Sequence, residues 1–404
     1  MAHHPGTSYG RAMQSPPSSG QLRAIVTVLL LWLAGLCAAM QYAKIGVPFT
    51  QFEAMYPAAG ARIGWLLSLV SLIGAIFGMT AGIAVTGFGL RRSLLVAMLL
   101  GAAMSGLQSM LGDLGPLLLS RVVEGLSHLV MVIAAPTLIA QISPPGLRSF
   151  FMTLWATFFG VAYALMSWLG MDFIADHGIP ALFRLHAVLM LGVAAALWLL
   201  LPSGPRGMKV ELPSLSRIVE TQLRAIRSPF IAAPGFGWLF YTLTFVSLLA
   251  ILPGLFPENR RSFVTGTLPL FSIATSLLLV PPLLRWLPPT KVVMAGFACA
   301  ALGATGLLLP VDPGLAASVL FCGLGLVQGS SFAAVPALNQ SAADRALSNG
   351  LMAQSGNLGN LLGTPVLLVL QAQTGQTGLV MAILCGYILA IFCHQWMARR
   401  RHYV

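Results

Sequence analysis

Apolar runs recur along almost the whole chain, each long enough at about 20 residues to cross the roughly 30 Å hydrocarbon core of a bilayer. Only 8% of the 404 residues are charged, whereas a soluble domain carries about a quarter. Within hydrocarbon the backbone must satisfy its own hydrogen bonds, so spanning segments are helices or closed barrels. Because the runs are unbroken rather than alternating, we expect an all-α integral membrane protein.

The spacing of the runs predicts twelve transmembrane helices in two bundles of six. They are expected over residues 22–47, 61–86, 93–111, 115–140, 149–170, 181–201, 234–255, 264–285, 290–310, 314–338, 346–370 and 377–397. One long polar interior stretch divides them. The predicted organisation is a disordered cytoplasmic tail over 1–21, an N-terminal bundle over 22–201, a cytoplasmic linker over 202–228, a C-terminal bundle over 229–398 and a basic cytoplasmic tail over 399–404.

Basic residues set the expected orientation. Most of the 22 Lys and Arg fall in the two tails, the linker and the loops on the same side of the predicted helices. Since Lys and Arg concentrate in cytoplasmic loops, both termini are predicted to be cytoplasmic, in the plasma (inner) membrane of a bacterium. The net charge of +12 is therefore a topology signal, and we expect no nucleic-acid partner.

The two predicted bundles resemble each other in sequence. TLIAQISPPGLRSFFMTLWAT in the first half is similar to ALNQSAADRALSNGLMAQS in the second, with Arg148 matching Arg345. A parallel repeat of six helices is a known plan of membrane transporters.

Two motifs carry a resemblance to a known family. In SRVVEGLSHLVMVIAAP, residues 120–136, Arg121, Glu124 and Gly125 fit its fourth-helix pattern of Arg, two residues, a polar residue and Gly. In GIAVTGFGLRR, residues 82–92, Gly82 and Gly89 fit its loop pattern. The sequence thus resembles the major facilitator superfamily over nearly the whole chain after the N-terminal tail.

The resemblance implies two six-helix bundles that rock about a central site, giving alternating access to a solute. It also implies a gating loop of Gly82, Gly89, Arg91 and Arg92, although Thr86 replaces the family's acidic residue there. The segment 160–170 lacks the proline of many antiporters, which favours uniport or symport over antiport.

One helix face combines Arg121, Glu124 and His128 within an apolar segment. Glu124 is the acidic residue that falls well inside a predicted span, where charge is costly. One interpretation is a structural pair in which Arg121 neutralises Glu124. The other is that Glu124 exchanges protons during transport, with Arg121 and His128 assisting, which predicts a proton-coupled transporter.

Polar and aromatic residues in several predicted helices are candidates for a central substrate cavity. They are Gln41, Lys44, Trp155, Arg184, Trp238, Tyr241, Gln354 and Asn357. An excess of cations over acids among those of the first half favours a small polar or anionic organic solute, or a drug-like compound. Lys44 and Arg184 could instead extend toward the outer interface.

Other functions remain as alternatives. The 18 methionines, with His128 and Met131 three positions apart, would suit a copper transporter of the same superfamily. The incomplete loop motif would suit a membrane sensor or assembly factor that does not transport. We expect no enzyme activity, no cofactor and no bound metal, because no catalytic or metal-ligating constellation is visible. The chain is expected to act as a monomer.

Overall fold

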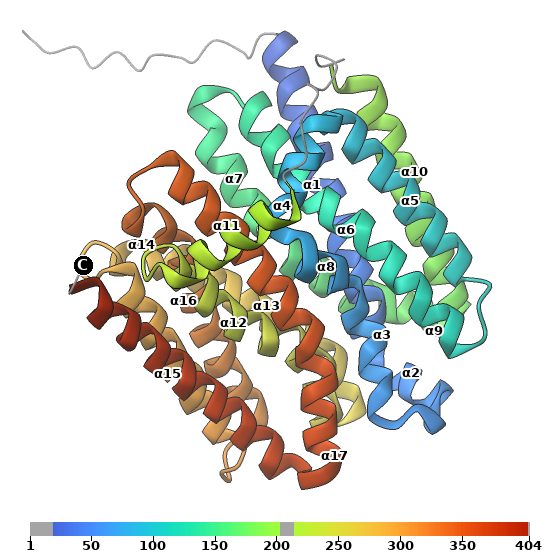
Figure 1. Ribbon diagram of the computed structural model, residues 1–404. Coiled ribbons are helices and arrows are strands. Elements are labelled where there is room, and N and C mark those ends of the chain that lie inside the picture. Colours follow the sequence, from blue (N-terminus) through green and yellow to red (C-terminus); the bar gives the residue numbers. More distant parts are fainter. Residues whose placement is uncertain (1–18, 203–213, 403–404) are drawn as a thin grey trace, which may run out of the picture.

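The computed structural model describes residues 19–202 and 214–402, and every regular element in those ranges is a helix (Figure 1). The expected tail over 1–21 and the first part of the expected linker therefore lie mostly outside the described residues. The all-α prediction is confirmed for the described part of the chain.

The N-terminal half runs from α1 to α10. Its elements are α1 (Ser19–Gly46), α2 (Phe49–Met55), η1 (Pro57–Ile63), α3 (Gly64–Ser68), η2 (Leu69–Ser71), α4 (Leu72–Phe88), α5 (Leu90–Gln108), α6 (Leu114–Ile142), η3 (Pro145–Leu147), α7 (Arg148–Ala156), α8 (Phe158–Leu165), the π-helical turn η4 (Met166–Gly170), α9 (Met171–His177) and α10 (Ile179–Leu200).

The C-terminal half follows a surface helix. The elements are α11 (Leu215–Arg227), α12 (Ala232–Ile251), η5 (Leu252–Leu255), α13 (Glu258–Leu278), α14 (Val280–Leu283), α15 (Pro289–Gly306), α16 (Pro313–Leu338) and α17 (Ala342–His402). Helix α17 is broken at Gly375, whose φ of +67° is a conformation that glycine adopts readily.

Among the described residues, ten helices are long and apolar enough to cross a membrane. The last of them, Ala342–Arg401, contains the break at Gly375 and so provides two crossings. Helix α15 lies outside that set, but it packs between α16 and α17 as a spanning helix would. These elements are consistent with the twelve predicted helices.

Glycine sets the sharp turn between the second and third spans. Gly89 ends α4 and precedes α5 with a φ of +96°, which residues with a side chain rarely adopt. The second glycine of the loop motif therefore has a direct backbone role.

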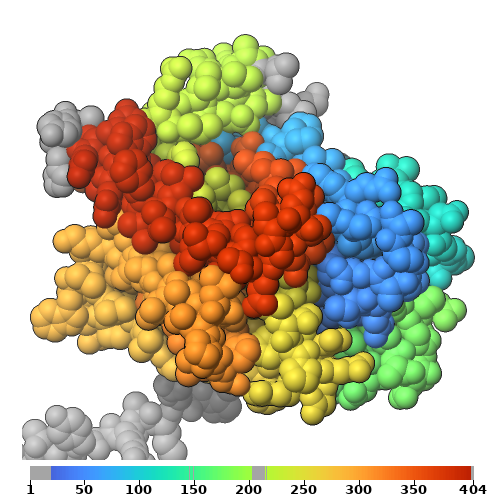
Figure 2. All heavy atoms as spheres, turned by 90° about the horizontal axis from the view of Figure 1, so that it is seen from below, coloured from blue at the N-terminus to red at the C-terminus, as the bar shows by residue number. Residues whose placement is uncertain are grey.

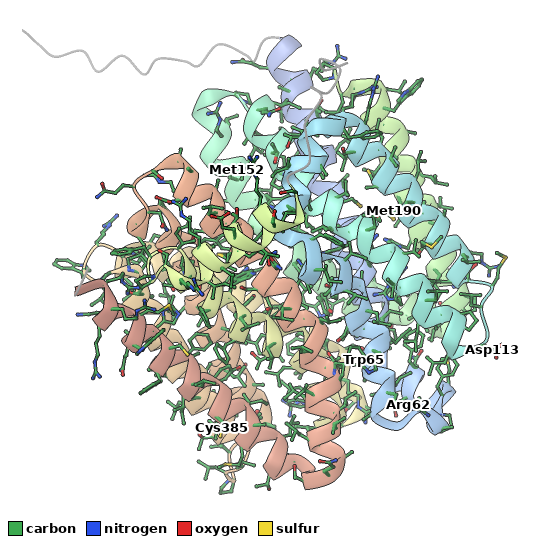
Figure 3. The ribbon with its side chains drawn as sticks, in the orientation of Figure 1. Arg62, Trp65, Asp113, Met152, Met190 and Cys385 are labelled. Carbon is green, nitrogen blue, oxygen red and sulfur yellow. The ribbon has the colours of Figure 1, made fainter. Side chains whose placement is uncertain are left out.

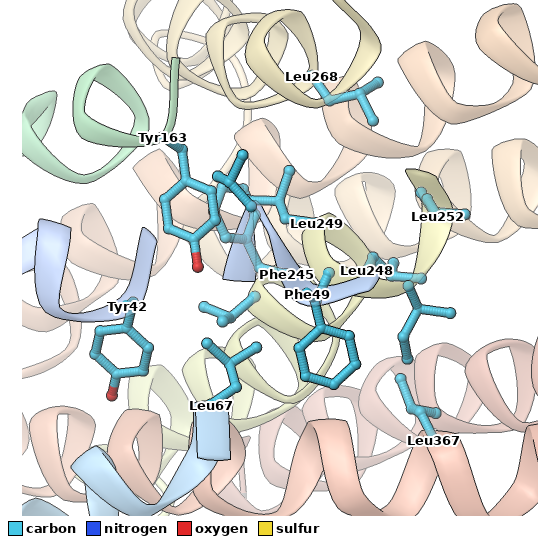
Figure 4. Close-up of a cluster of buried hydrophobic side chains, with 14 of the residues drawn as sticks. Tyr42, Phe49, Leu67, Tyr163, Phe245, Leu248, Leu249, Leu252, Leu268 and Leu367 are labelled. Atoms are coloured by element: carbon cyan, nitrogen blue, oxygen red, sulfur yellow. The ribbon is translucent and has the colours of Figure 1, made fainter. Parts of the chain in front are cut away.

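The two halves share one hydrophobic core at one end of the molecule. Side chains of the N-terminal half such as Tyr42, Phe49 and Tyr163 lie in one buried cluster with Phe245 and Leu367 of the C-terminal half (Figure 4). This end includes α2, and Arg62 and Asp113 mark it in Figure 3. Burying apolar side chains from both halves closes the interface there.

At the opposite end, which holds the start of α1, helix α11 and the end of α17, the cores are separate. One cluster, which includes Val28, Met131 and Leu197, is built from the N-terminal half alone. Another includes Ala225, Leu351 and Met397 of α11 and the C-terminal half, with Met79 of α4 packed against it. Among the described residues, the buried cluster shared by both halves therefore lies at the first end, and here the N-terminal half contributes the partly buried Met79.

Two seams join the halves. Along the first, α3 and α4 pack against α17, and Figure 2 shows these blue and orange-red segments side by side. Along the second, α8 and η4 pack against α13. Glycines permit both approaches, because a Cβ at Gly74 would overlap Asn357 and one at Gly266 would overlap Trp168.

Candidate functional site

The carboxylate of Glu124 lies at the centre of a charge network inside the N-terminal half. Arg121, one turn earlier on α6, donates from Nη1 to Glu124 Oε2. The remaining donors of Arg121 bind backbone, with Nε 2.9 Å from the carbonyl oxygen of Leu66 and Nη2 2.6 Å from that of Gln41. Arg121 therefore ties α6 to α3 and α1 as well as pairing with Glu124.

Lys44 of α1 completes the network from the other side. Its Nζ lies 2.7 Å from each of three acceptors: Glu124 Oε1, Gln108 Oε1 and Ser105 Oγ. A lysine ammonium has three N–H donors, so its hydrogen-bonding capacity is filled. The ammonium also lies over the ring of Phe183, whose centroid is 5.0 Å from Nζ.

Neutral polar groups of α5 and α10 surround the charges. Gln108 Nε2 donates to Glu124 Oε2 at 2.8 Å and to Ser120 Oγ at 3.1 Å. Ser105 Oγ lies 2.8 Å from Nδ1 of His186, and Nε2 of His186 lies 3.0 Å from the carbonyl oxygen of Cys37. That carbonyl can only accept, so Nε2 of His186 carries hydrogen and Nδ1 is free to accept from Ser105.

Small residues let these helices approach closely enough. A Cβ at Gly125 would stand 2.4 Å from the carbonyl oxygen of Val70, so α6 touches the η2 backbone directly. A Cβ at Gly101 would stand 2.5 Å from Ser127 Oγ and 2.8 Å from Gln41 Nε2. Substitution at either glycine would force these groups apart.

The network carries an unbalanced charge. Lys44 and Arg121 contribute two positive charges and Glu124 one negative charge, so with neutral histidines the sum is +1. All three side chains are 0% exposed. Burial away from water is costly for any ion, and a pair offsets that cost only for matched charges. One cation in the network therefore has no carboxylate of its own.

His128 lies close to the network but outside its hydrogen bonds. Its Nδ1 is 3.1 Å from the carbonyl oxygen of Ala38, and its ring packs edge-on against Tyr42 with centroids 5.0 Å apart. The three residues predicted on one face of α6 therefore divide into a bonded pair, Arg121 and Glu124, and a neighbour that faces α1.

Aromatic side chains form a continuous band across the interface between the halves. In the N-terminal half Trp155 stacks on Phe158, with ring centroids 4.5 Å apart. In the C-terminal half Trp238 stacks on Tyr241, with ring centroids 4.6 Å apart. The rings between them complete the band, with Phe158 on Phe159, Phe159 on Phe245, and Phe245 on Tyr241. Three predicted cavity residues, Trp155, Trp238 and Tyr241, therefore belong to one series of contacting rings.

The other predicted cavity residues are dispersed. The side chain of Arg184 is exposed on α10 and does not join the network. Asn357 faces Gly74 across the first seam. Gln354 donates to the carbonyl oxygen of Ala75 at 3.0 Å and lines a pocket of about 190 Å³ between α4, α11, α12 and α17.

Residues of the loop motif contact their own half. Arg91 Nη2 donates to the carbonyl oxygen of Trp198 at 2.7 Å, which ties the start of α5 to the end of α10. The side chain of Arg92 is exposed, and a Cβ at Gly82 would meet nothing within 4 Å. In the described part of the chain, the contacts recorded for Arg91 do not reach the C-terminal half.

Two packed helical halves with ionised side chains buried inside one of them define the class of helical membrane transporters. The chain belongs to the Major Facilitator Superfamily, whose family model matches residues 31–364. No curated protein matches its sequence closely enough to be counted as a relative.

Among solved structures, the chain is similar to a bacterial homologue of the human lysosomal transporter Spinster, described as inward-facing and unoccupied. The two share 14% identity over 93% of this chain and 97% of that one, with a TM-score of 0.70. At that identity the likeness supports the fold alone.

The partners of Lys44 are what sequence reasoning missed. Ser105 and Gln108 stand three positions apart in an apolar segment, so they share a helix face, and that spacing was a usable signal. No pattern in the sequence indicated that this face meets Lys44. Among the described residues, no group of three or more His, Cys, Asp and Glu is arranged to hold a metal ion.

Proposed function

We propose that this protein is a secondary active transporter that moves a small organic solute across the membrane by alternating access, coupled to protons through the network around Glu124. The observation that carries the proposal is the burial of three ionised side chains in one bundle of a transporter fold. Charges inside membrane helices are expensive, and they mark ion or proton pathways.

The arrangement of the two cores supports alternating access. With both termini in the cytoplasm of a bacterial cell, as the basic loops favour, the shared core faces outside and the separate cores face inside. The arrangement would then be closed to the exterior. Rocking of the halves along the glycine-lined seams would open the outer end and close the inner end.

The placement of charge and rings favours one of the expected solute classes. Lys44 and Arg121 are fully engaged by Glu124 and neighbouring acceptors, and Arg184 is exposed elsewhere, so these cations do not form an anion pocket. The aromatic band offers stacking surfaces at the interface of the halves. We infer a solute with an aromatic or apolar part, of the drug-like kind.

A thermal-stability panel on the detergent-purified protein tests the solute class. The compounds are acetate, benzoate, phenylalanine, ethidium and glucose, of which acetate and benzoate differ by a ring at constant charge. A compound that binds only the folded protein raises its melting temperature. We expect ring-bearing compounds to do so, with the effect lost in Trp238→Ala and retained in Arg184→Ala. Stabilisation by acetate that requires Arg184 would contradict the assignment.

Flux measurements test the coupling. The purified protein would be reconstituted into vesicles, and a pH gradient would be imposed across their membrane. Accumulation of the stabilising compound inside the vesicles would then be measured. The wild type is expected to accumulate it, and Glu124→Gln is expected to lose accumulation because the carboxylate that holds both cations is gone. Accumulation by Glu124→Gln at the wild-type level would reject coupling through this network. The absence of any flux from the wild type would favour a sensor or assembly role.

A further inference from the structure

We propose that the proton carried by this network belongs to Lys44, and that Glu124 is its fixed counter-charge. The inference rests on the proposed proton coupling and specifies the atom that carries it. It follows from the hydrogen-bond polarity around Glu124, the charge count of the network and the different chemistry of its two cations.

Among the described residues, every group recorded in contact with the carboxylate of Glu124 is a donor. Oε1 faces the Lys44 ammonium, and Oε2 faces the Arg121 guanidinium and the amide Nε2 of Gln108. A protonated carboxyl group would need an acceptor for its hydrogen, and these contacts supply none. Protonation would also raise the charge of the buried network from +1 to +2. Glu124 is therefore held as a carboxylate in this arrangement.

The two cations differ in what they can release. An arginine guanidinium stays protonated in proteins, whereas a lysine amine loses its proton readily when buried. Glu124 pairs with both cations, and Arg121 keeps its proton, so Lys44 is the cation that can release the excess charge. Release of one proton from Lys44 takes the network from +1 to 0 and removes the unbalanced buried charge.

The geometry corresponds to the proton-loaded form. Three acceptors at 2.7 Å match the three N–H donors of an ammonium. On unloading, one Nζ–H bond breaks, its electron pair remains on nitrogen, and the proton passes to water admitted when the halves rearrange. The neutral amine keeps two N–H donors, and the hydroxyl of Ser105 turns from Nδ1 of His186 to donate to the nitrogen lone pair. Reloading is the reverse step, so one proton moves per cycle.

The titratable groups around Lys44 do not offer an equivalent role. Helix α6 presents Glu124, Arg121 and His128, and α8 presents Tyr163 beside Gly46. Helix α5 presents the neutral Ser105 and Gln108. Helix α10 presents His186, whose Nδ1 is 3.5 Å from Nζ. A proton passed to His186 would stay inside the network and leave its total charge unchanged.

Nitrogen NMR on the full-length protein in micelles tests this directly. The sequence contains three lysines, Lys44, Lys209 and Lys291, so lysine-selective labelling gives few side-chain signals. Lys44→Met identifies the signal of Lys44, and the exposed Lys291 serves as an internal reference. We expect the Lys44 signal to convert from ammonium to amine as the pH is raised while the protein stays folded.

Two results would overturn the inference. One is a Lys44 signal that stays in the ammonium form at every pH at which the protein is folded. The other is a Glu124 carboxyl signal, identified by its loss in Glu124→Gln, that titrates while Lys44 does not. Thermal melts of each variant establish that it is folded before its spectrum is interpreted.

Vesicle assays separate this inference from the proposed function. In Lys44→Arg the charge is permanent, and in Lys44→Met it is absent, so both variants are expected to lose pH-driven accumulation of the solute. If the wild type shows no pH-driven accumulation, the proposed coupling fails whatever the NMR result. If the wild type accumulates and Lys44→Arg does so equally, the assignment to Lys44 fails and the coupling stands.

Discussion

Gly125→Ala is predicted to loosen the network without altering any charged residue. The new Cβ would lie 2.4 Å from the carbonyl oxygen of Val70, whereas ordinary contact begins at 3.4 Å, so α6 must withdraw by about 1 Å. A withdrawal of that size lengthens the 2.9 Å bond from Arg121 Nε to the carbonyl oxygen of Leu66 beyond hydrogen-bonding range.

The free-energy cost combines three contributions. A lost hydrogen bond from a charged donor costs about 1.5–3 kcal/mol. Overpacking adds about 1–3 kcal/mol. The higher helix propensity of alanine offsets about 1 kcal/mol of this loss of stability. We therefore expect Gly125→Ala to be about 1.5–5 kcal/mol less stable than the wild type, the net of two costs and one gain.

Equilibrium unfolding in mixed micelles with a denaturing detergent, followed by circular dichroism, measures this loss. The matched control is Gly192→Ala on α10, where a Cβ would meet nothing within 4 Å. The control is expected to be unchanged or up to about 1 kcal/mol more stable. If Gly125→Ala is as stable as Gly192→Ala, the close approach of α6 to η2 does not support the network, and the reasoning is refuted.

Three further predictions concern the seam, a helix start and a buried histidine. Gly78→Ala should lower the free energy of unfolding by about 1–3 kcal/mol, because its Cβ would lie 2.8 Å from the Cα of Gln354. Gly82→Ala in the same helix should leave it unchanged, since a Cβ there meets nothing within 4 Å. Unfolding curves of the two variants that coincide would contradict this. A backbone N–H at the start of α16 lowers the pKa of Asp312, so its contribution is complete above about pH 4 and is lost on acidification through the lowered pKa. Asp312→Ala should therefore lower the melting temperature at pH 7, with the difference from the wild type vanishing in acid. His394 is 1% exposed and neither ring nitrogen has a partner among the described residues, so His394→Leu should leave stability unchanged or raise it by about 1–2 kcal/mol; a clear loss would indicate a polar group bound there.

Hydrophobic run length and loop charge were enough to predict most of the fold. Each span must be long and apolar to cross the bilayer, so its existence is written locally in the sequence. The boundaries were less predictable, because proline, glycine and irregular turns divide single spans. The fifth predicted helix, 149–170, comprises α7, α8 and the π-helical turn η4, and helix continues through α9 to His177. The two helices predicted over 346–370 and 377–397 form one element broken at Gly375.

The candidate site was only half predictable. Arg121 and Glu124 stand three positions apart on one helix, so helical geometry alone brings them together. Lys44 is 80 positions away from Glu124, and its contact depends on how α1 packs against α6. Arg184 has the same charge and a similar place in the sequence pattern, yet its side chain faces outward. A single sequence gives no measure of which face of each helix points inward when most faces are apolar.

The sequence by itself determined that the chain is a helical membrane protein in two halves, because the bilayer imposes length and hydropathy on every span. It also determined that Glu124 has a partner, since a lone carboxylate inside a span would be too costly. Tertiary structure alone decided that two cations share that carboxylate, that Lys44 rather than Arg184 is the second, and that the shared core closes one end. These features depend on contacts between helices far apart in the chain, where packing of apolar faces and close approach at glycine choose among many alternatives.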